Sequence, residues 1–433
     1  MAGGFLFTTK KSSNKPKPPP PHQQQYYRSK TFSKFIPVAL AYSLVTHTGL
    51  LLSRPFFRFK VAGIPRPEDC FRLGGGNVSE SPGTNENVAI VTGSNTGLGF
   101  ETASSLVDLG YDVVLACRDR EKGEKAALLI NEKEDEDAVV TQKRGKAVFL
   151  HPLDLSSFQS VKEFHKCFVK EYSHLNILVN NAGMNNKRGV SIDGMNLCFQ
   201  INFVGHYLLT RLLIPHLSKA KNSFLKSTES NRDVEAGKVV NLSSVTHHFA
   251  SCLEERTIEN NDIALMSSEH NREWWNGCAM PDVSGNVYKE SKLAMAVFTN
   301  ELNNRYSQQG VRAISANPGS VSSDIWRKKP KYMQKLYRLL YLSAKAGSTT
   351  SVAAAVGRLP QDAVYLQPYW QPFRQHSRKK GKTSFGKKYS VPLPFTEMLG
   401  PYIGYAVTNP RLPSNVDSSS SQLWDAFDDI VPK

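Results

Sequence analysis

The chain has 433 residues, an apolar share of 40% that is ordinary for a globular protein, and a formal net charge of +16. The length allows one large α/β domain with extensions, or two domains. Much of the positive charge is local, because residues 1–67 contain no Asp or Glu and a second basic run covers 374–388. We therefore interpret the charge as basic tails and loops, and we predict no nucleic-acid partner.

Cysteine usage points away from metal binding. The six cysteines are scattered, with no Cys-x-x-Cys pair and no His/Cys cluster at zinc-site spacing. Several lie within apolar runs, which is typical of small core residues in a reducing compartment. We predict no metal site.

The N-terminal region divides into three segments by composition. Residues 1–34 are rich in Lys, Ser, Gln and Pro, which predicts a disordered basic tail. Residues 35–53 are mostly apolar and form a hydrophobic anchor or targeting segment, interrupted by a proline and several polar residues. Residues 54–84 are a linker into the fold.

The hydrophobic segment has three interpretations that the sequence leaves open. As a membrane anchor, with contact through residues 35–52, it predicts a protein on the endoplasmic reticulum membrane with its basic tail facing the cytosol. As a cleaved targeting peptide, it predicts import into an organelle. The third interpretation is a helix packed on the folded domain.

The first predicted strand, 88–91, runs directly into a glycine-rich turn and then a helix that ends at Gly110. This order predicts a site for a dinucleotide pyrophosphate, because glycines let the backbone approach the phosphates at the positive end of the helix. The turn residues assigned to the cofactor are Gly93, Ser94, Asn95, Thr96, Gly97, Leu98 and Gly99.

The second predicted strand, 112–118, ends in Cys117 and Arg118, where NAD-preferring sites carry an acidic ribose ligand. Arg118 can pair with a 2′-phosphate, so the sequence favours NADP(H) over NAD(H). The alternative for Arg118 is a surface ion pair with Asp119 or Glu121.

Further strands are predicted to alternate with helices. Asp154 follows the strand 147–150, where it either accepts a hydrogen bond from an adenine amino group or caps the next helix. The strands 177–180, 238–242 and 313–316 lead into Asn181, Ser244 and Pro318-Gly319. The alternation predicts an α/β fold, a Rossmann-type doubly wound parallel sheet in one catalytic domain, whose site lies at the carboxyl ends of the strands.

Tyr288 and Lys292 are four residues apart, so they face the same way on a helix. An ammonium beside a phenol lowers the phenol pKa from its usual value near 10, which brings proton transfer toward working pH. Ser244 supplies a hydroxyl that can hold a substrate oxygen. With a nicotinamide cofactor, this set provides what the reduction of a carbonyl needs.

In their order along the chain, these motifs resemble the short-chain dehydrogenase/reductase family over about residues 86–357. The segment Ala116-Cys117-Arg118-Asp119 is similar to the retinol-dehydrogenase-like branch, which typically uses NADP(H). The motifs are Thr92-Gly93-Ser94-Asn95-Thr96-Gly97-Leu98-Gly99, Asn180-Asn181-Ala182-Gly183, Asn202, Ser244, Tyr288-x-x-x-Lys292 and Pro318-Gly319.

The resemblance implies a role for each matching residue. Tyr288 would be the catalytic acid/base, with its pKa lowered by Lys292, which also binds the nicotinamide ribose. Ser244, rather than Ser243, would orient the substrate oxygen, and Asn202 would hold the water of a proton relay. The further cofactor-binding residues are Asp154, Leu155, Asn181, Ala182, Gly183, Tyr288, Lys292, Pro318, Gly319, Val321 and Ser323.

Within the domain 85–433, three segments depart from the family pattern. An insertion at about 246–284 contains His247-His248, which we interpret as loop or core. Residues 326–344 fit an amphipathic helix that lies over the site or on a membrane. A second insertion, 367–412, is interpreted as a surface excursion, after which a helix around Trp424 docks its apolar stripe.

The sequence therefore predicts an NADP-dependent oxidoreductase that interconverts an alcohol and a carbonyl on a hydrophobic substrate such as a retinoid, a sterol or a lipid. Two alternatives stay open: a double-bond reductase like the related protochlorophyllide reductases, and a non-catalytic cofactor-sensing interaction protein. The family's frequent pairing through two long helices implies a homodimer, unless the insertions block that face.

Overall fold

The computed structural model describes the folded domain and leaves the N-terminal region outside. The predicted tail, hydrophobic segment and linker therefore lie outside the described residues, as does Ser323. The described residues are 87–133, 144–185, 189–220, 237–250, 268–283, 286–322, 330–357, 359, 362–369, 404–408, 410, 412 and 416–432.

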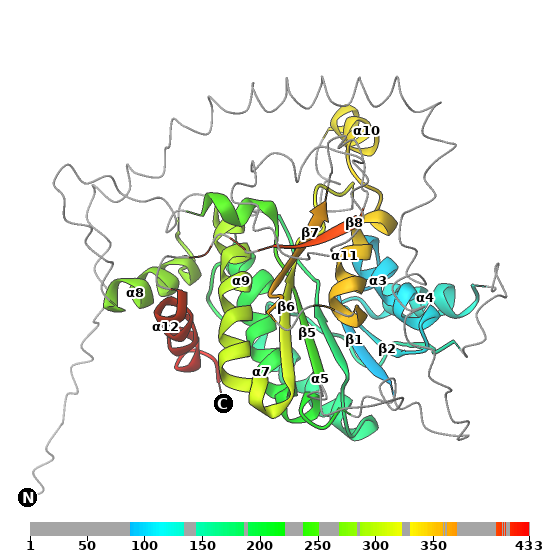
Figure 1. Ribbon diagram of the computed structural model, residues 1–433, viewed down its shortest axis with the longest axis horizontal. Helices are drawn as coiled ribbons and strands as arrows, with labels where there is room; N and C mark the ends of the chain where they lie inside the picture. Colours follow the sequence, from blue (N-terminus) through cyan, green and yellow to red (C-terminus); the bar gives the residue numbers. More distant parts are fainter. Residues whose placement is uncertain are drawn as a thin grey trace, which may run out of the picture.

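An eight-stranded sheet of order β3-β2-β1-β4-β5-β6-β7-β8 forms the centre of the molecule (Figure 1). The first seven strands are parallel, and β8 is antiparallel to β7. This confirms the predicted doubly wound sheet. The strands are β1 (Val88–Thr92), β2 (Asp112–Ala116), β3 (Ala147–Val148), β4 (Ile177–Asn180), β5 (Gly237–Leu242), β6 (Val311–Ala316), β7 (Tyr365–Tyr369) and β8 (Gly404–Thr408).

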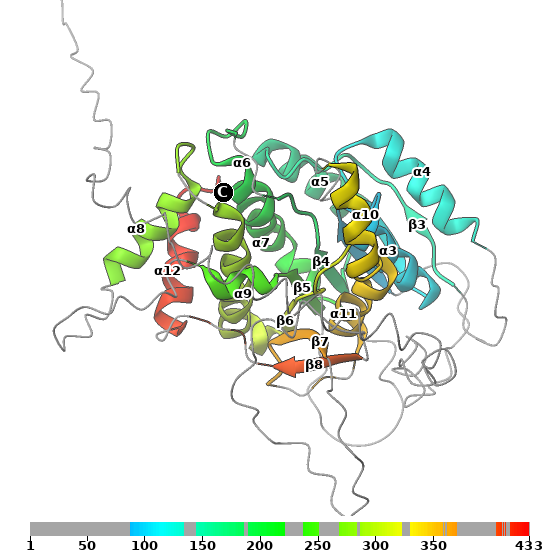
Figure 2. The same cartoon turned by 90° about the horizontal axis from the view of Figure 1, so that it is seen from above.

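Helices cover both faces of the sheet, and each face has its own apolar core (Figures 1 and 2). Every residue of β1 and β2 is buried, which is why these strands are almost uniformly apolar. One face carries α3 (Gly97–Asp108), α4 (Arg120–Asn131) and α11 (Ala344–Val356); the other carries α5 (Phe158–Glu171), α7 (Gly205–Leu217) and α9 (Val287–Tyr306).

The stretch Leu197–Leu217 is apolar and long enough to cross a membrane, but 78% of its most apolar window is buried inside the protein. It consists of α6 (Leu197–Phe199), η2 (Gln200–Val204) and α7. The residues of α7 pack on the sheet together with α5 and α9. We therefore interpret this stretch as a core helix.

The second predicted insertion is partly built into the sheet. Its start was placed at 367, but β7 continues to Tyr369, and β8 lies within the same stretch. The prediction of a surface excursion was therefore wrong for these residues. β7 contains Pro368 but pairs with β6 only through Tyr365 and Leu366, so the proline interrupts no ladder with β6.

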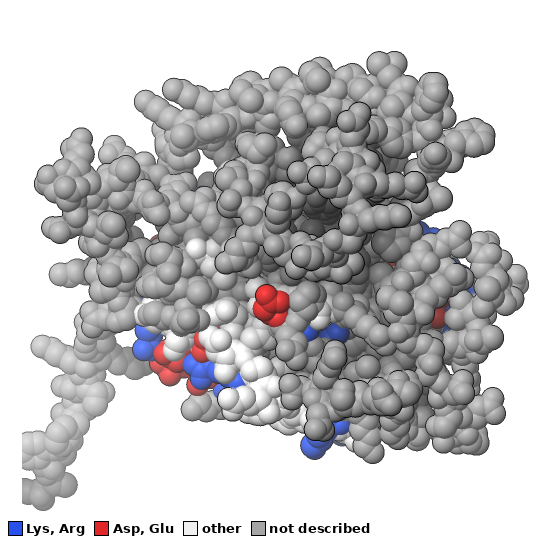
Figure 3. Space-filling model, in the orientation of Figure 1, with Lys and Arg blue, Asp and Glu red and all other residues white. Residues whose placement is uncertain are grey.

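The predicted closing helix is α12 (Val416–Asp428), which lies beside α9 and α8 (Ser268–Ala279) (Figures 1 and 2). Trp424 is buried, and its ring lies 5.2 Å from the ring of Tyr207 on α7 and 6.1 Å from that of Phe298 on α9. The Tyr207 hydroxyl donates to Trp424 O at 3.1 Å. Lys or Arg and Asp or Glu side chains alternate on the surface here (Figure 3).

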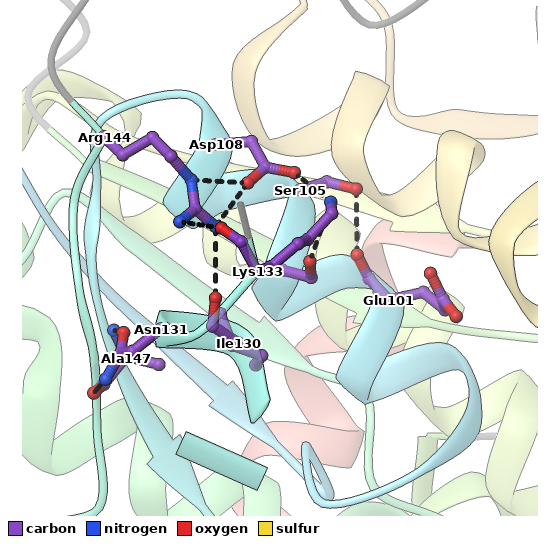
Figure 4. A network of polar contacts seen from close by, with 9 residues as sticks. Glu101, Ser105, Asp108, Ile130, Asn131, Lys133, Arg144 and Ala147 are labelled. Atoms are coloured by element: carbon purple, nitrogen blue, oxygen red, sulfur yellow. Dashed lines mark hydrogen bonds and ion pairs between the residues drawn. The ribbon is translucent and has the colours of Figure 1, made fainter. Parts of the chain in front are cut away.

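At the amino edge of the sheet, Asp108 joins the ends of α3 and α4 to the start of β3 (Figure 4). Arg144 donates to Asp108 Oδ1 from Nε at 2.9 Å and from Nη2 at 2.7 Å, and Lys133 Nζ donates to Oδ2 at 2.7 Å. Arg144 also donates to the carbonyls of Lys133 and Ile130. We call these residues, Asp108, Lys133 and Arg144, the amino-edge clamp.

Candidate active site

The turn between β1 and α3 needs glycine at two positions. Gly93 has a φ of 65°, and a Cβ there would lie 2.9 Å from the Cα of Ala182. At Gly99 a Cβ would lie 2.3 Å from the Gly93 carbonyl oxygen. The turn, the start of α3 and the segment after β4 are therefore packed too closely for any side chain at these two positions.

Asn181 and Thr92 fasten the segment after β4 to the glycine turn. The Asn181 side chain donates from Nδ2 to Thr92 O at 2.7 Å. The backbone N–H groups of Asn181 and Ala182 both donate to Thr92 Oγ1 at 2.9 Å. The Asn181 amide nitrogen thus holds the turn, and its contact with a ribose stays a prediction.

A dinucleotide fits this turn. Ser94 is fully buried, and within the described part of the chain its hydroxyl has no hydrogen-bond partner. Leaving a buried hydroxyl unpaired costs about 1–3 kcal/mol, so a ligand oxygen would stabilise the site. The close backbone approach and the N-terminus of α3 are the features that bind a pyrophosphate.

Arg118 is exposed at the end of β2 and makes no hydrogen bond or ion pair with the residues that the structure describes. Its expected alternative partner, Asp119, caps α4 and pairs with Lys122. Hydrogen bonds from Lys122 hold the pKa of Asp119 below its usual value. The guanidinium of Arg118 is thus available to an anion.

Asp154 does not cap the following helix. Its Oδ1 accepts from the N–H and the hydroxyl of Ser156, at 2.9 and 2.6 Å, and Ser157 is the residue that caps α5. The capping alternative was wrong, because α5 begins at Phe158 and its N-cap is Ser157, three residues after Asp154. Leu155 is buried against Gly205, where a Cβ would lie 2.5 Å from Leu155 O.

Ser244 and Tyr288 meet at the carboxyl end of β5. The side chain of Ser244 is hydrogen-bonded to that of Tyr288, which lies in the first turn of α9. Ser244 also accepts from Thr246 N at 3.3 Å. Ser243 instead donates to Lys292 O at 2.9 Å and ties α9 to β5. The structure thus brings Ser244, not Ser243, to the tyrosine.

Burial dominates the electrostatics of this group. It raises the pKa of Tyr288 to about 12, against the lowering effect of the Ser244 hydrogen bond, and it lowers the pKa of Lys292 to about 8. Lys292 Nζ donates to Leu242 O at 2.9 Å and lies 5.7 Å from the centre of the Tyr288 ring. The expected lowering of the Tyr288 pKa by Lys292 was wrong, because burial is the largest effect and raises this pKa, and the effect that lowers it is the Ser244 hydrogen bond.

Asn202 lies in η2, where the backbone makes a wider turn than an α-helix; Gly205 N donates to Gln200 O. Wide turns of this kind often occur at functional sites. The Asn202 side chain accepts from Met184 N at 2.8 Å and donates to Ser291 Oγ at 3.0 Å. Its amide is therefore held between the segment after β4 and α9.

Gly183 shows how close Asn202 and Lys292 are. A Cβ on Gly183 would lie 3.3 Å from Asn202 Oδ1 and 3.5 Å from Lys292 Nζ. Two neighbours of Asn202 were not predicted as site residues: Cys198, whose Sγ lies 3.5 Å from Asn202 Nδ2, and His206. The available signal was their spacing, since each is four residues from Asn202 on one helical stretch.

The segment after β6 closes over α3. Gly319 has a φ of 76°, and Val321 is bridged to Leu342 beyond α10 (Lys331–Leu340). At Gly347 on α11, a Cβ would lie 2.5 Å from Val321 Cγ2 and 2.9 Å from Leu98 Cδ2. Pro318, Val321 and Leu98 therefore lie together beside Gly347.

The His247-His248 pair, interpreted as loop or core, lies in η4 (Val245–Phe249), directly after Ser244. Both side chains are buried, and their rings lie 4.0 Å apart. His247 Nδ1 hydrogen-bonds to Ser244 O at 2.6 Å. The pair is thus part of the packing beneath the site.

Comparisons with known proteins agree with this geometry. Residues 87–252 match a family model described as short chain dehydrogenase. The chain is 34% identical over 311 residues to retinol dehydrogenase 11 of Mus musculus, covering 71% of this chain and 84% of that protein. It is 30% identical over 302 residues to retinol dehydrogenase 12 of Homo sapiens, covering 69% and 82%.

Among solved structures, an uncharacterized protein from Mycobacterium paratuberculosis has the same fold. The TM-score is 0.50 at 23% sequence identity, and the match covers 80% of this chain and 93% of that one. At this identity the likeness concerns the fold alone. Family membership is shown by the two retinol dehydrogenases named above.

Proposed function

Because the chain belongs to the short-chain dehydrogenase/reductase family, whose members are NAD(P)-dependent oxidoreductases, we propose that it interconverts an alcohol and a carbonyl on a hydrophobic substrate, with NADP(H) preferred. The observation that carries this proposal is the meeting of Ser244, Tyr288 and Lys292 at the sheet edge that holds the glycine turn. A proton donor, a polarising hydroxyl and a dinucleotide cradle together fit carbonyl reduction.

The residues of the chain divide the work of reduction between them. The nicotinamide cofactor supplies the hydride when bound. With a pKa of about 12, Tyr288 is neutral at pH 7, as an unperturbed phenol would be, so it holds a proton that it can donate to the carbonyl oxygen. The Ser244 hydroxyl, beside the same phenol, polarises that oxygen.

Lys292 and Asn202 would take part in returning a proton to Tyr288 after it has donated one. With a pKa of about 8, Lys292 is still mostly protonated at pH 7. Its Nζ lies close to Gly183, as does Asn202 Oδ1. We keep the predicted roles, Lys292 on the nicotinamide ribose and Asn202 on a relay water, as part of the proposal.

The preference for NADP(H) rests on Arg118. The guanidinium is exposed where an acidic residue would favour NAD, and the neighbouring carboxylate of Asp119 is engaged by Lys122. A 2′-phosphate would therefore meet a positive charge and no free carboxylate from these residues.

A bulky apolar substrate, such as a retinoid, a sterol or a lipid, is supported by the names of the relatives, which are retinol dehydrogenases. The amphipathic helix α10 stands beyond the carboxyl ends of the strands (Figure 1). Its Tyr337 stacks on Tyr341 with ring centres 4.8 Å apart. We propose that this segment borders the substrate entrance.

Membrane association stays a proposal from the sequence. Residues 35–52 would hold the protein on the endoplasmic reticulum membrane with the tail in the cytosol; the alternative is import into an organelle.

Self-association as a homodimer is also part of the proposal. Because α12 already covers part of α7 and α9, a homodimer would need a different face.

The test is a titration of the full chain with NADPH and NADH, followed by nicotinamide fluorescence, and then an assay with hydrophobic aldehydes and ketones. Tight NADPH binding and an alcohol product support the proposal. A product saturated at a carbon–carbon bond would favour the double-bond reductase. Cofactor binding without turnover of any substrate class would favour the cofactor-sensing interaction protein.

A further inference from the structure

His206 is a buried histidine to which the proposed chemistry assigns no role. It lies in the first turn of α7, directly after the Gly205 that packs on Leu155. Its Nε2 lies 2.9 Å from Thr92 Oγ1, and its Nδ1 lies 3.2 Å from the backbone oxygen of Asn202. One imidazole ring therefore joins the glycine turn to the helix turn that carries Asn202.

The partners of the ring decide where its proton lies. The oxygen of Asn202 is a carbonyl and can only accept, so Nδ1 must carry hydrogen. In a neutral ring Nε2 is then the acceptor. Thr92 Oγ1 already accepts from the N–H groups of Asn181 and Ala182, which leaves its own proton to donate. Its two acceptors in reach are His206 Nε2 at 2.9 Å and Val179 O at 3.3 Å. The contact with Nε2 is the shorter one, and Val179 O already accepts from Asn181 N, so we assign the Thr92 proton to Nε2.

The surroundings keep the ring neutral. Burial is the largest effect and lowers the pKa of His206 to about 3; the ammonium of Lys292 lowers it further, against the opposing hydrogen bond to Asn202. The ring is therefore expected to stay neutral, without titrating, between pH 5 and 8. Its contribution has to come from the two hydrogen bonds that it fixes.

Those two hydrogen bonds lie in a continuous polar chain across the site. On one side, Thr92 holds the segment after β4 to the glycine turn. On the other side, the Asn202 side chain donates to Ser291, and the Ser291 hydroxyl donates to Tyr288 O at 2.7 Å. The chain thus runs from the cofactor turn to the backbone of the proposed acid/base.

We propose that His206 is a positioning residue that, as the neutral tautomer with hydrogen on Nδ1, holds the cofactor-binding turn and Asn202 in fixed relative positions. The proposal rests on the proposed function, which assigns cofactor binding to the turn beside Thr92 and a relay water to Asn202. It adds that the two ring nitrogens serve different steps, with Nε2 supporting cofactor binding through Thr92 and Nδ1 supporting turnover through Asn202.

Two variants separate the two nitrogens. Gln places an acceptor near the Nε2 position and loses the Nδ1 donor, whereas Asn keeps a donor near the Nδ1 position and loses the Nε2 acceptor. We expect His206→Gln to keep the dissociation constant for NADPH within about twofold and to lower kcat about tenfold. We expect His206→Asn to weaken NADPH binding about tenfold and to change kcat at saturating NADPH much less.

A matched control lies on the same helix. His216 is also on α7 but packs against Phe168 and His165, so His216→Gln should change neither constant. His206→Leu removes both hydrogen bonds and should show both defects. If His206→Gln, His206→Asn and His206→Leu impair binding and turnover equally, the ring has only a packing role and the proposal is overturned.

A second measurement does not depend on turnover. Nitrogen NMR of the full chain, labelled in histidine and assigned with His206→Gln, should show His206 Nε2 without hydrogen, and no titration between pH 5 and 8. Hydrogen on Nε2, or titration in this range, would contradict the proposal. If the chain turned over no substrate, the proposed function would fail, while the tautomer and the NADPH constants would still decide this inference.

Discussion

At the amino edge of the sheet, the amino-edge clamp matches each carboxylate oxygen of Asp108 with a cationic donor (Figure 4). At the carboxyl edge, the buried hydroxyl of Ser94 has no partner among the described residues. Lys292 is also buried there, and burial lowers the pKa of its ammonium. The first edge is complete without a ligand. The second is arranged so that a cofactor and a substrate would complete it.

The difference separates stability from function within one sheet. Paired charges that are partly exposed, such as Asp108 and Lys133, contribute modestly to stability and need nothing else. A buried charge such as the Lys292 ammonium reduces stability, but groups with shifted pKa values are typical of sites that carry out chemistry. Substitutions at the two edges should therefore have opposite signatures, and four of them test this, from the largest expected effect to the smallest.

Tyr288→Phe removes the proposed proton donor. Turnover should fall about 10²- to 10⁴-fold, while the dissociation constant for NADPH and the thermal midpoint stay near those of the wild type. The measurements are steady-state kinetics and a fluorescence titration. Tyr172→Phe is the control and should keep full activity, because Tyr172 lies at the C-terminal end of α5 and stacks on Phe168. Undiminished turnover in Tyr288→Phe would remove this residue from the mechanism.

Lys292→Met tests the stability cost of the buried charge. Lys292 releases its proton near pH 8 when folded and near 10.5 when unfolded, so between these values the unfolded chain binds more protons. The free energy of unfolding of the wild type should therefore rise with pH in this window. Relative to the wild type, the variant should be stabilised below pH 8 by about 1–3 kcal/mol more than at pH 10.

Urea unfolding of both proteins without cofactor, at pH 7 and pH 10, measures this difference. The raised pKa of Tyr288 acts only above pH 10, so it does not mask the effect of Lys292 below that value. A difference between the two proteins that stays constant from pH 7 to pH 10 would mean that the Lys292 ammonium is well solvated.

Arg118→Ala tests the cofactor side of the carboxyl edge. The dissociation constant for NADPH should rise about tenfold and that for NADH should change little, because one charged hydrogen-bond partner of the 2′-phosphate is lost. Arg120→Ala is the matched control, since Arg120 is a nearby exposed arginine that pairs with Glu124. Equal weakening of both cofactors would assign Arg118 a role other than phosphate recognition.

Asp108→Asn tests the amino edge. The free energy of unfolding should fall by about 1 kcal/mol, which allows for the partial exposure of the amino-edge clamp. The kinetic constants should stay within twofold of the wild type. Glu124→Gln, in an exposed pair, should cost less. A change in the kinetic constants of more than twofold would show that the two edges are coupled.

The sequence predicted best what depends on burial on both faces of a strand. The continuous apolar runs of β1 and β2 and the residues directly after β4, β5 and β6 could be placed because strand ends in a parallel sheet share an edge. β8 was missed because its short run, 404–408, follows a long basic and proline-rich stretch and pairs at the sheet margin.

The electrostatics of the site were harder to predict. The spacing of Tyr288 and Lys292 places them on one helix face, but only the packing shows that burial is the largest effect on the pKa of each. Asp154 satisfied a capping pattern, yet the neighbouring Ser157 took that place. His206 could have been noticed by its spacing from Asn202, but its partner Thr92 is 114 positions away in the chain.

The packing of α12 has a consequence for the order of events during synthesis. Trp424 and Phe427 belong to the same apolar core as Tyr207 and Phe298. A chain that is still being made on the ribosome lacks these side chains until residues 416–432 have emerged. The core on this face therefore stays incomplete until α12 has been synthesised, so the domain can reach its full packing only at the end of translation.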